Sequence, residues 1–245
     1  MLEKAFRMKG NYALITGSAD RIGRGIALEL ASQGYNLLLH YNSSRGKAED
    51  LKHQVDKYGV KSQLLQINFM VDNDFDAIFS SLKSDNINID LLVNCASDFR
   101  PSSFEDIGSD LYHKEMRINF ENIYLLTKSF ARVYLKGSII NFIDTKVEKN
   151  YSKHLDYILS KKLLKEFTKL SAVHLAPNFR VNAIAPGLIL PPKDKDESYL
   201  LNLAQDIPLK TIGNLQEILK AVNFLIDSNF VTGQILYIDG GDHLI

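Results

Sequence analysis

The stretch Thr16-Gly17-Ser18-Ala19-Asp20-Arg21-Ile22-Gly23-Arg24-Gly25 decides the fold predicted for this chain. It joins an apolar run, Tyr12–Thr16, to a helical pattern over Ile22–Gln33. Glycines at a strand-to-helix turn let the backbone approach a phosphate closely, and amide groups at the start of the helix then bind the anion. The glycine spacing does not fit the general G-x-G-x-x-G dinucleotide fingerprint. On its own, the turn therefore leaves nucleotide binding open.

The same alternation of apolar runs and helical patterns continues to the end of the chain. Further strands are predicted at Asn36–Tyr41, Ser62–Ile67, Asp90–Asn94, Ser138–Ile143, Arg180–Ile184 and Ile235–Ile238. Helices are predicted at Gly46–Lys57, Asn73–Lys83, Ser109–Leu135, Tyr151–Ala176 and Leu215–Asp227. Short runs rich in Val, Ile and Leu are typical of strands buried on both faces of a parallel sheet. We therefore expect a single α/β domain over residues 1–245, a doubly wound, Rossmann-type, seven-stranded parallel sheet with helices on both faces.

Composition and charge exclude several classes of protein. The 245 residues carry 29 Lys and Arg against 29 Asp and Glu, so the net charge gives no electrostatic support for binding nucleic acid or an anionic membrane. No apolar run approaches the length of about 18 residues that spans a bilayer, and the amino-terminal residues lack the apolar core of a secretory signal. The single cysteine, Cys95, agrees with reducing conditions. We therefore expect a cytoplasmic protein with a small-molecule partner, no nucleic acid, no membrane and no metal site.

One irregular region, Gly187 to Gly213, follows the sixth predicted strand and contains Pro191-Pro192 and a charge-dense KDKDE run. Ligands of such sheets bind at the carboxyl ends of the strands, which favours a substrate lid around residues 188–213. The alternative is a solvated loop.

The end of the second predicted strand indicates which dinucleotide binds. Enzymes that use NAD place an acidic residue there, whereas this chain has His40-Tyr41-Asn42-Ser43-Ser44-Arg45. With two hydroxyls, Arg21 and Arg45 nearby and no carboxylate, the pocket favours the 2′-phosphate of NADPH. The alternative is that both arginines are solvated loop residues.

Tyr157 and Lys161 are four residues apart in a helical pattern and therefore share one helix face. A phenol with a pKa near 10 is a weak acid at neutral pH unless a cation stabilises its anion. An ammonium about 4 Å away contributes roughly 4 kcal/mol at an effective dielectric near 20, or about three pKa units. The pair thus predicts a tyrosine with its pKa brought close to neutrality.

Several motifs in the same order resemble the short-chain dehydrogenase/reductase family. They are the turn from Thr16-Gly17 to Ile22-Gly23, Tyr-x-x-x-Lys at Tyr157 and Lys161, Arg180-Val181-Asn182-Ala183-Ile184-Ala185-Pro186-Gly187, and Val231-Thr232-Gly233-Gln234 with Asp239-Gly240-Gly241. The resemblance implies that Lys161 holds the nicotinamide ribose and that Asn119 supports a water relay to Lys161; an N-cap or a buried amide is the alternative for Asn119. It implies cofactor contacts with Gly17, Arg21, Ile22, Gly23, His40, Tyr41, Ser43, Ser44, Asn68, Phe69, Asn94, Ala96, Ser97, Tyr157, Lys161, Pro186, Gly187 and Ile189.

Three departures from the family pattern resemble its pteridine reductase branch. Arg21 replaces the middle glycine of the turn, Asp144 stands where the family has a serine 13 residues before Tyr157, and Asn94-Cys95-Ala96-Ser97-Asp98-Phe99 is similar to N-N-A-S-x-F. The likeness implies proton delivery to a ring nitrogen by Asp144 and Tyr157, stacking of a pterin on Phe99, and substrate contacts from Arg21 and Ser97. The alternatives are a strand-end turn cap for Asp144 and a core side chain for Phe99.

Within this branch, the stretches Phe142 to Tyr157, Leu188 to Leu190 and Phe230 to Leu244 resemble the dihydromonapterin reductases. The likeness implies NADPH-dependent reduction of a dihydropterin, with dihydrofolate as a further substrate. A 3-oxoacyl-thioester reductase and a non-catalytic NADP(H)-binding regulator are the alternatives. An enoyl reductase fits less well because its tyrosine and lysine are farther apart.

His154 is close enough to Tyr157 in sequence to reach the site, although a surface or packing role is the simpler interpretation. A homotetramer or homodimer packed through the two long helices is also implied, although apolar faces there serve the core of one chain equally well.

Overall fold

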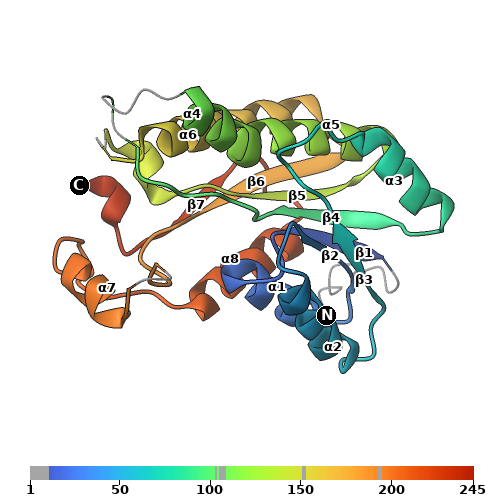
Figure 1. Ribbon diagram of the computed structural model, residues 1–245, viewed down its shortest axis with the longest axis horizontal. Helices are drawn as coiled ribbons and strands as arrows, with labels where there is room; N and C mark the ends of the chain where they lie inside the picture. The colour runs from blue at the N-terminus through green and yellow to red at the C-terminus, as the bar shows by residue number, and fades with distance from the viewer. Residues whose placement is uncertain (1–10, 103, 105–108, 151–152, 193–194) are drawn as a thin grey trace.

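A seven-stranded parallel sheet forms the centre of the computed structural model, which describes residues 11–102, 104, 109–150, 153–192 and 195–245 (Figure 1). The strands are β1 (Tyr12–Thr16), β2 (Asn36–Tyr41), β3 (Ser62–Gln66), β4 (Ile89–Asn94), β5 (Gly137–Phe142), β6 (Phe179–Pro186) and β7 (Ile235–Ile238). Their order is β3-β2-β1-β4-β5-β6-β7, and every neighbouring pair is parallel. The predicted fold class is confirmed, and each predicted strand agrees with the observed one to within two residues.

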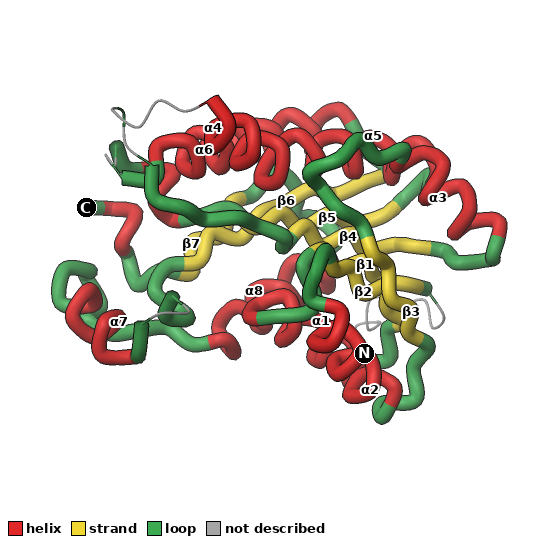
Figure 2. Tube along the Cα trace, in the orientation of Figure 1, coloured by secondary structure: helices red, strands yellow, loops and turns green. Residues whose placement is uncertain are grey.

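Helices cover both faces of the sheet (Figures 1 and 2). On one face lie α1 (Arg21–Ser32), α2 (Arg45–Asp56) and α8 (Leu215–Asp227); on the other lie α3 (Phe75–Ser84), α4 (Ser109–Met116), α5 (Asn122–Val133) and α6 (Leu155–His174). Successive strand residues point to opposite faces. In β1, Ala13 and Ile15 therefore join the core beneath α1 and α8, while Leu14 joins the core beneath α3 and α5.

Two predicted helices differ from the observed ones. The pattern over Ser109–Leu135 is not one α-helix, because a π-helical turn, η1 (Arg117–Glu121), separates α4 from α5. Such a turn carries an extra residue and often marks a functional site. The second helix begins at Leu155 rather than Tyr151, because His154 adopts a left-handed conformation with φ of 61° that cannot continue a helix. Tyr151 and Ser152 lie outside the described residues.

The predicted lid region contains a helix that the sequence pattern did not reveal. This helix, α7 (Glu197–Ala204), lies beyond the carboxyl ends of β6 and β7 (Figure 1) and buries Leu200 and Ala204. Residues 197–204 of this segment are therefore helical rather than irregular, while a role as a substrate lid stays a prediction. Two single turns, η2 (Thr145–Glu148) and η3 (Asp242–Leu244), follow β5 and β7. Within the described residues, no helix combines the length and the apolar character needed to cross a bilayer.

Candidate active site

The turn after β1 is closed so tightly that only glycine fits at two positions. Gly17 has φ of 65°, and a Cβ there would lie 2.8 Å from Cα of Ala96. A Cβ at Gly23 would lie 2.4 Å from the carbonyl oxygen of Gly17. The hydroxyl of Thr16 accepts from the amides of Cys95 and Ala96, both at 3.0 Å, and so joins this turn to the loop after β4. These two loops meet where the strand order reverses, which is where ligands of doubly wound sheets bind.

The side chain of His40 supports the same turn through a hydrogen bond with its backbone. The amide of Gly17 donates to its Nδ1 at 3.0 Å, so Nε2 carries the ring hydrogen and donates to the Ile67 carbonyl at 3.1 Å. The ring also stacks on Phe69 at 4.7 Å. Burial lowers the pKa of His40 to about 4, so the imidazole is neutral. Both ring nitrogens of His40 are bonded within the protein, so the ring supports the turn, and the predicted cofactor contact of His40 stays a prediction.

The end of β2 opens onto the amino terminus of α2. Ser44 is the N-cap of α2, and among the described residues its hydroxyl makes no capping hydrogen bond. Amide groups at a helix start attract anions, and the first turn, Arg45 to Ala48, contains no acidic residue. Arg45 is exposed and pairs with Glu49 at 2.8 Å. Ser43, Ser44 and this helix end fit a phosphate group, while Arg45 would first have to leave Glu49.

Arg21 contacts the segment after β6 that the sequence predicts to be a lid. Its two terminal nitrogens donate to the carbonyl of Pro191 at 2.8 Å and to that of Leu190 at 3.2 Å. Its backbone is left-handed, with φ of 53°, a conformation that glycine adopts without strain. Arg21 thus connects the phosphate turn with the segment after β6, and its predicted contacts with a phosphate or a pterin stay predictions.

Asp144, Tyr157 and Lys161 meet at the carboxyl end of β5. Oδ2 of Asp144 accepts from the Tyr157 hydroxyl at 2.9 Å, while Oδ1 accepts from the amide of Lys146 at 2.8 Å. Asp144 is therefore both a turn cap and the partner of Tyr157, the two roles that the sequence left as alternatives. Nζ of Lys161 donates to the carbonyl of Phe142 at 2.9 Å and lies 5.7 Å from the centre of the Tyr157 ring.

The predicted lowering of the Tyr157 pKa is wrong in this structure. Burial raises the pKa of Tyr157 well above its usual value, and the charge of Asp144 raises it further. Lys161 does not donate to the Tyr157 hydroxyl in this structure; its ammonium group donates to the Phe142 carbonyl. Burial also lowers the pKa of Lys161 to about 8, with Asp144 opposing that shift. Tyr157 is therefore a protonated donor whose hydrogen points at a carboxylate.

Asn119 lies in the π-helical turn, and its side chain is fully hydrogen-bonded. Its Oδ1 accepts from the Ser97 hydroxyl at 2.8 Å and the Asp98 amide at 3.0 Å. Its Nδ2 donates to the Asp98 carbonyl at 2.9 Å and to Glu115 at 2.5 Å. The buried amide that the sequence left as an alternative is observed, and the side chain fixes the loop after β4. Support of a water relay by Asn119 stays a prediction.

Phe99 stands at the mouth of the site as the sequence suggested, and it is 46% exposed rather than a core residue. Its ring stands nearly perpendicular to the ring of Tyr157, with 4.7 Å between the ring centres. One face of the Phe99 ring, however, is covered by the stacked ring of His154, with 4.0 Å between the ring centres. Nζ of Lys146 lies 5.4 Å from the ring centre. A flat substrate would therefore stack on the opposite face or displace His154, which makes His154 and Lys146 part of the candidate pocket.

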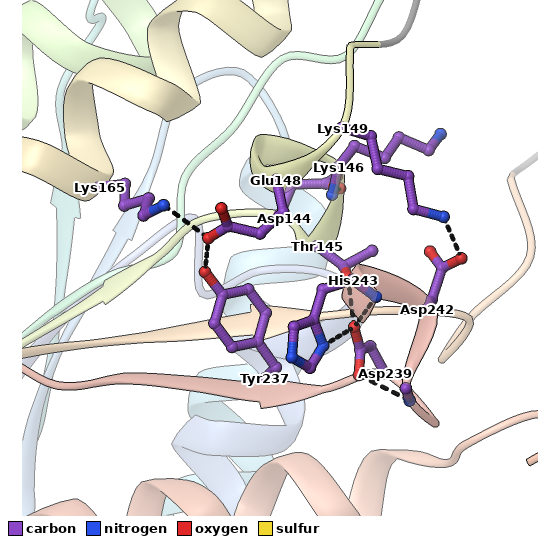
Figure 3. Close-up of polar contacts among 11 residues, drawn as sticks. Asp144, Thr145, Lys146, Glu148, Lys149, Lys165, Tyr237, Asp239, Asp242 and His243 are labelled. Atoms are coloured by element: carbon purple, nitrogen blue, oxygen red, sulfur yellow. Dashed lines mark hydrogen bonds and ion pairs between the residues drawn. The ribbon is translucent and has the colours of Figure 1, made fainter. Parts of the chain in front are cut away.

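The carboxyl-terminal segment braces the turn that presents Asp144 (Figure 3). Buried Asp239 accepts from the hydroxyl of Thr145, from the backbone and ring of His243 at 2.8 Å each, and from the amide of Gly241 at 3.0 Å. At the rim, Lys149 pairs with Asp242 at 2.5 Å. Glu148 accepts from Tyr237 and pairs with Lys165 at 2.6 Å. Contacts with η3 and β7 thus hold the whole of η2.

The other predicted cofactor residues surround this site but do not all expose a side chain. Pro186 and Gly187 end β6 beside Asp239, and a Cβ at Gly187 would lie 2.7 Å from the Asp239 Cα. Side chains that face the protein interior are Tyr41, Phe69, Asn94 and Ile189, all of them buried. Any contact of these four with a cofactor would involve their backbone. Ile22 packs partly buried against the core, and Asn68 caps its own turn through the amide of Met70 at 2.9 Å.

Comparison with known proteins agrees with this geometry. A family model described as enoyl-(acyl carrier protein) reductase matches residues 17–243. The chain belongs to the short-chain dehydrogenase/reductase family. Dihydromonapterin reductase of Citrobacter koseri is 30% identical, over 94% of this chain and 96% of its own length. The 3-oxoacyl-[acyl-carrier-protein] reductase FabG of Aquifex aeolicus is 28% identical, over 96% and 98%. The structure of FolM alternative dihydrofolate reductase 1 from Brucella suis, in complex with NADP, has a TM-score of 0.90 at 28% identity and covers 97% of this chain and 96% of that chain.

Membership in the short-chain dehydrogenase/reductase family confirms the resemblance predicted from the motifs and makes this protein an oxidoreductase. Three features of the site were not predicted from sequence. Glu115 lies four residues before Asn119, so the helix period already places both on one face. Lys146 and His154 lie between Asp144 and Tyr157 in sequence, and although His154 was expected to be able to reach the site, nothing in that spacing indicates contact with Phe99. Asp239 precedes a Gly-Gly pair at a strand end, where a polar brace is common, yet its link to Thr145 spans 94 residues.

Proposed function

We propose that this protein is an NADPH-dependent reductase of a pterin or dihydropterin, of the dihydromonapterin or dihydrobiopterin kind, with dihydrofolate as a further substrate. The observation that carries the proposal is the hydrogen bond of 2.9 Å from the Tyr157 hydroxyl to Asp144. The pairing places an anionic acceptor where a carbonyl reductase needs a donor. Dihydromonapterin reductase and FolM, similar to this chain over nearly its full length, support the same substrate class.

The chemistry of the pair Asp144 and Tyr157 suits a ring nitrogen better than a ketone. A ketone oxygen only accepts hydrogen bonds and is repelled by a carboxylate, whereas a pterin carries N–H groups that a carboxylate accepts. Hydride addition to a C=N carbon leaves a strongly basic nitrogen, which a phenol protonates even when its pKa is raised. The proton goes from Tyr157 to that nitrogen, and Tyr157 regains a proton from water. Lys161 stabilises the transient phenolate.

The cofactor is NADP(H), which supplies the hydride when bound. The tight glycine turn at Gly17 and Gly23 leaves room for a pyrophosphate at the amino terminus of α1, where the first turn, Arg21 to Arg24, is free of acidic residues. Ser43 and Ser44 at the start of α2 would hold the 2′-phosphate, with Arg45 as the first residue of α2 and Arg21 as the first residue of α1. Lys161 would hold the nicotinamide ribose. NADP in the complex of Brucella suis FolM supports this choice over NAD.

The substrate class is tested by following NADPH oxidation with dihydromonapterin, dihydrobiopterin, dihydrofolate and an acetoacetyl thioester in parallel. We expect turnover of the pterins. Asp144→Ser is expected to lower pterin turnover by roughly 10²-fold or more while raising the relative rate with the thioester. Asp110→Asn, which changes an exposed carboxylate on α4, is the matched control. Turnover of the thioester alone by the wild-type protein would refute the proposal.

The second candidate is a 3-oxoacyl-thioester reductase, favoured by the similarity to FabG of Aquifex aeolicus. Enoyl reduction, named in the description of the family model, is disfavoured by the spacing of four residues between Tyr157 and Lys161. A non-catalytic NADP(H)-binding regulator is the third. It predicts tight NADPH binding without turnover of any substrate in the panel, although both Tyr157 and Lys161 are present and buried together.

We also propose that two or four chains assemble through α5 and α6. Exposed apolar side chains gather on these helices: Tyr124, Leu125, Leu159, Leu163 and Leu170. Contact between Tyr124 and Phe167 at 5.3 Å joins the two helices into one surface. Exposed apolar patches on soluble proteins commonly mark contact sites.

We propose the cytoplasm as the location of this protein, because its single cysteine, Cys95, fits a reducing compartment.

A further inference from the structure

Glu115 is a buried carboxyl group that the reaction described above does not use. It lies on α4, its side chain is 0% exposed, and Oε2 accepts from Nδ2 of Asn119 at 2.5 Å. Its other oxygen, Oε1, has no partner at full hydrogen-bond geometry among the described residues, although the backbone amide of Arg100 faces the carboxyl group and favours its charged form. Burying a carboxyl group that is only partly satisfied destabilises the fold, so its presence beside the active site calls for an explanation.

The hydrogen bonds of Asn119 connect Glu115 to the active site. Nδ2 of Asn119 donates to Glu115 and to the Asp98 carbonyl, and its Oδ1 accepts from Ser97 and Asp98. Ser97 and Asp98 begin the loop that carries Phe99, whose ring meets Tyr157. A change in the hydrogen bond between Glu115 and Asn119 therefore alters the position of the loop that lines the substrate pocket.

Charged and titratable groups face Glu115 from three elements. They are Asp98 in the loop after β4, Lys114 on α4 itself, and Tyr157 and Lys161 on α6. Asp98 pairs with Lys114 at 2.8 Å and with Arg100 at 3.0 Å, so both cations are already engaged by another carboxylate. Burial raises the pKa of Glu115 to about 7, and the charge of Asp98 adds to that shift. Glu115 thus changes charge in the physiological range.

We propose that Glu115 is a positioning residue of this active site, which fixes the loop after β4 through Asn119 and sets the electrostatic potential at Tyr157 and Lys161 through its own charge. When ionised, Glu115 makes a charge-assisted hydrogen bond to Asn119, consistent with the distance of 2.5 Å. The same negative charge raises the pKa of Tyr157 and that of Lys161. Protonation of Glu115 weakens both effects together.

Glu115→Gln keeps the shape and an acceptor oxygen but removes the charge. In the wild-type protein, the pH profile of kcat should show a step near pH 7 in addition to the alkaline limb of Tyr157 and Lys161. In Glu115→Gln the step should disappear, and the alkaline limb should move to lower pH because a negative charge has been removed. Glu121→Gln, an exposed change on the same helical segment, should retain the wild-type profile. Superimposable profiles for Glu115→Gln and the wild type would overturn the proposal.

A titration that needs no substrate separates this inference from the proposed function, on which its kinetic consequence rests. In ¹³C-carboxyl-labelled protein, one glutamate resonance should titrate near pH 7 and be missing in Glu115→Gln. Asn119→Ala, a second variant, should move the midpoint of that resonance upward, because the donor that stabilises the charged form is lost. If no glutamate titrates above its usual range, Glu115 does not have this role, whichever substrate is turned over.

Discussion

At the scale of single residues, the protonation state of Tyr157 depends on its burial and on the neighbouring Asp144. Its hydroxyl donates to Asp144, and burial together with that carboxylate raises its pKa, while a hydrogen bond with Ser97 opposes the shift. A tyrosine in this state gives up its proton only when a strong base forms next to it. Lys161, held on the Phe142 carbonyl, is placed to stabilise the anion afterwards.

Replacing Tyr157 by Phe should lower kcat by roughly 10²- to 10⁴-fold, because the positioned proton donor is lost while the ring is retained. NADPH affinity, measured by calorimetry, should change by less than about threefold, since Phe preserves the packing against Phe99. Tyr58→Phe, an exposed change, is the control. A Tyr157→Phe enzyme with near-normal turnover would remove Tyr157 from the mechanism.

At the scale of elements, two contacts between distant segments set the geometry of the site. The first is the brace between η2 and the carboxyl-terminal segment, in which Asp239 holds Thr145 next to Asp144 (Figure 3). The second joins the start of α1 to the lid through Arg21, whose guanidinium donates to the carbonyls of Leu190 and Pro191.

The brace predicts an effect for Thr145→Val, which is nearly isosteric but cannot donate to Asp239. Loss of one hydrogen bond corresponds to about 1 kcal/mol, and we expect roughly a fivefold lower kcat as Asp144 loses its alignment. NADPH affinity should be unchanged, since η2 is not part of the phosphate turn. Thr211→Val, which is exposed, is the matched control. Equal loss of kcat in both variants would argue against a specific brace.

The contact of Arg21 with the lid predicts faster exchange of lid amides in Arg21→Gly. The two hydrogen bonds to residues 190 and 191 are lost, while glycine relieves the left-handed backbone by roughly 1 kcal/mol. Hydrogen–deuterium exchange over residues 188–204 should therefore increase although the melting temperature stays constant or rises. Arg45→Ala, which lies in the neighbouring loop, should leave lid exchange unchanged. Unaltered exchange in Arg21→Gly would show that the lid is held by other contacts.

At the scale of the whole molecule, stability depends on the buried polar groups that join strands to loops. His40 bonds both to Gly17 and to Ile67 and stays neutral in the fold. Its pKa is about 4 in the folded protein, below the usual 6.5 of an unfolded chain, so the unfolded state binds more protons between these values. Stability is therefore full above pH 6.5 and is lost as the pH falls toward 4.

The expected loss from His40 alone is about 3 kcal/mol between pH 6.5 and 4. Urea unfolding followed by circular dichroism across this range measures it. In His40→Gln the amide can accept from Gly17 and donate to Ile67 without titrating, so the acid-side loss should shrink. His113→Gln, an exposed change, should retain the wild-type dependence. The same pH dependence in His40→Gln as in the wild type would assign the effect to other groups.

Assembly through α5 and α6 predicts that Leu163→Glu yields monomers, because burying a charge at an apolar interface is strongly unfavourable. Sedimentation or light scattering should show a dimer or tetramer for the wild type. Leu209→Glu, which changes an exposed apolar side chain outside α5 and α6, should keep the assembly. A monomeric wild-type protein would leave the apolar surface of α5 and α6 without this explanation.

The sequence by itself determined the order of the strands and helices along the chain and the types of residue in the site. Apolar patterns reflect the directions in which successive side chains leave a helix or a strand, which is a local property of the backbone, so β1 and α8 begin and end where their patterns do. The spacing of Tyr157 and Lys161, four residues on one helix face, is likewise local. The π-helical turn at Asn119 was not predicted, because the apolar residues on either side of it still fit a continuous helix.

Only the tertiary structure decided which partners these residues have, because the partners come from segments far apart in the chain. Asp144 became the acceptor of Tyr157, and Arg21 bonded to the carbonyls of Leu190 and Pro191, 169 and 170 residues away. The pKa of Tyr157 rose rather than fell, because burial and the neighbouring carboxylate of Asp144 disfavour the phenolate. Local sequence patterns record helix and strand geometry, whereas desolvation and charge pairing depend on which loops the sheet topology brings together.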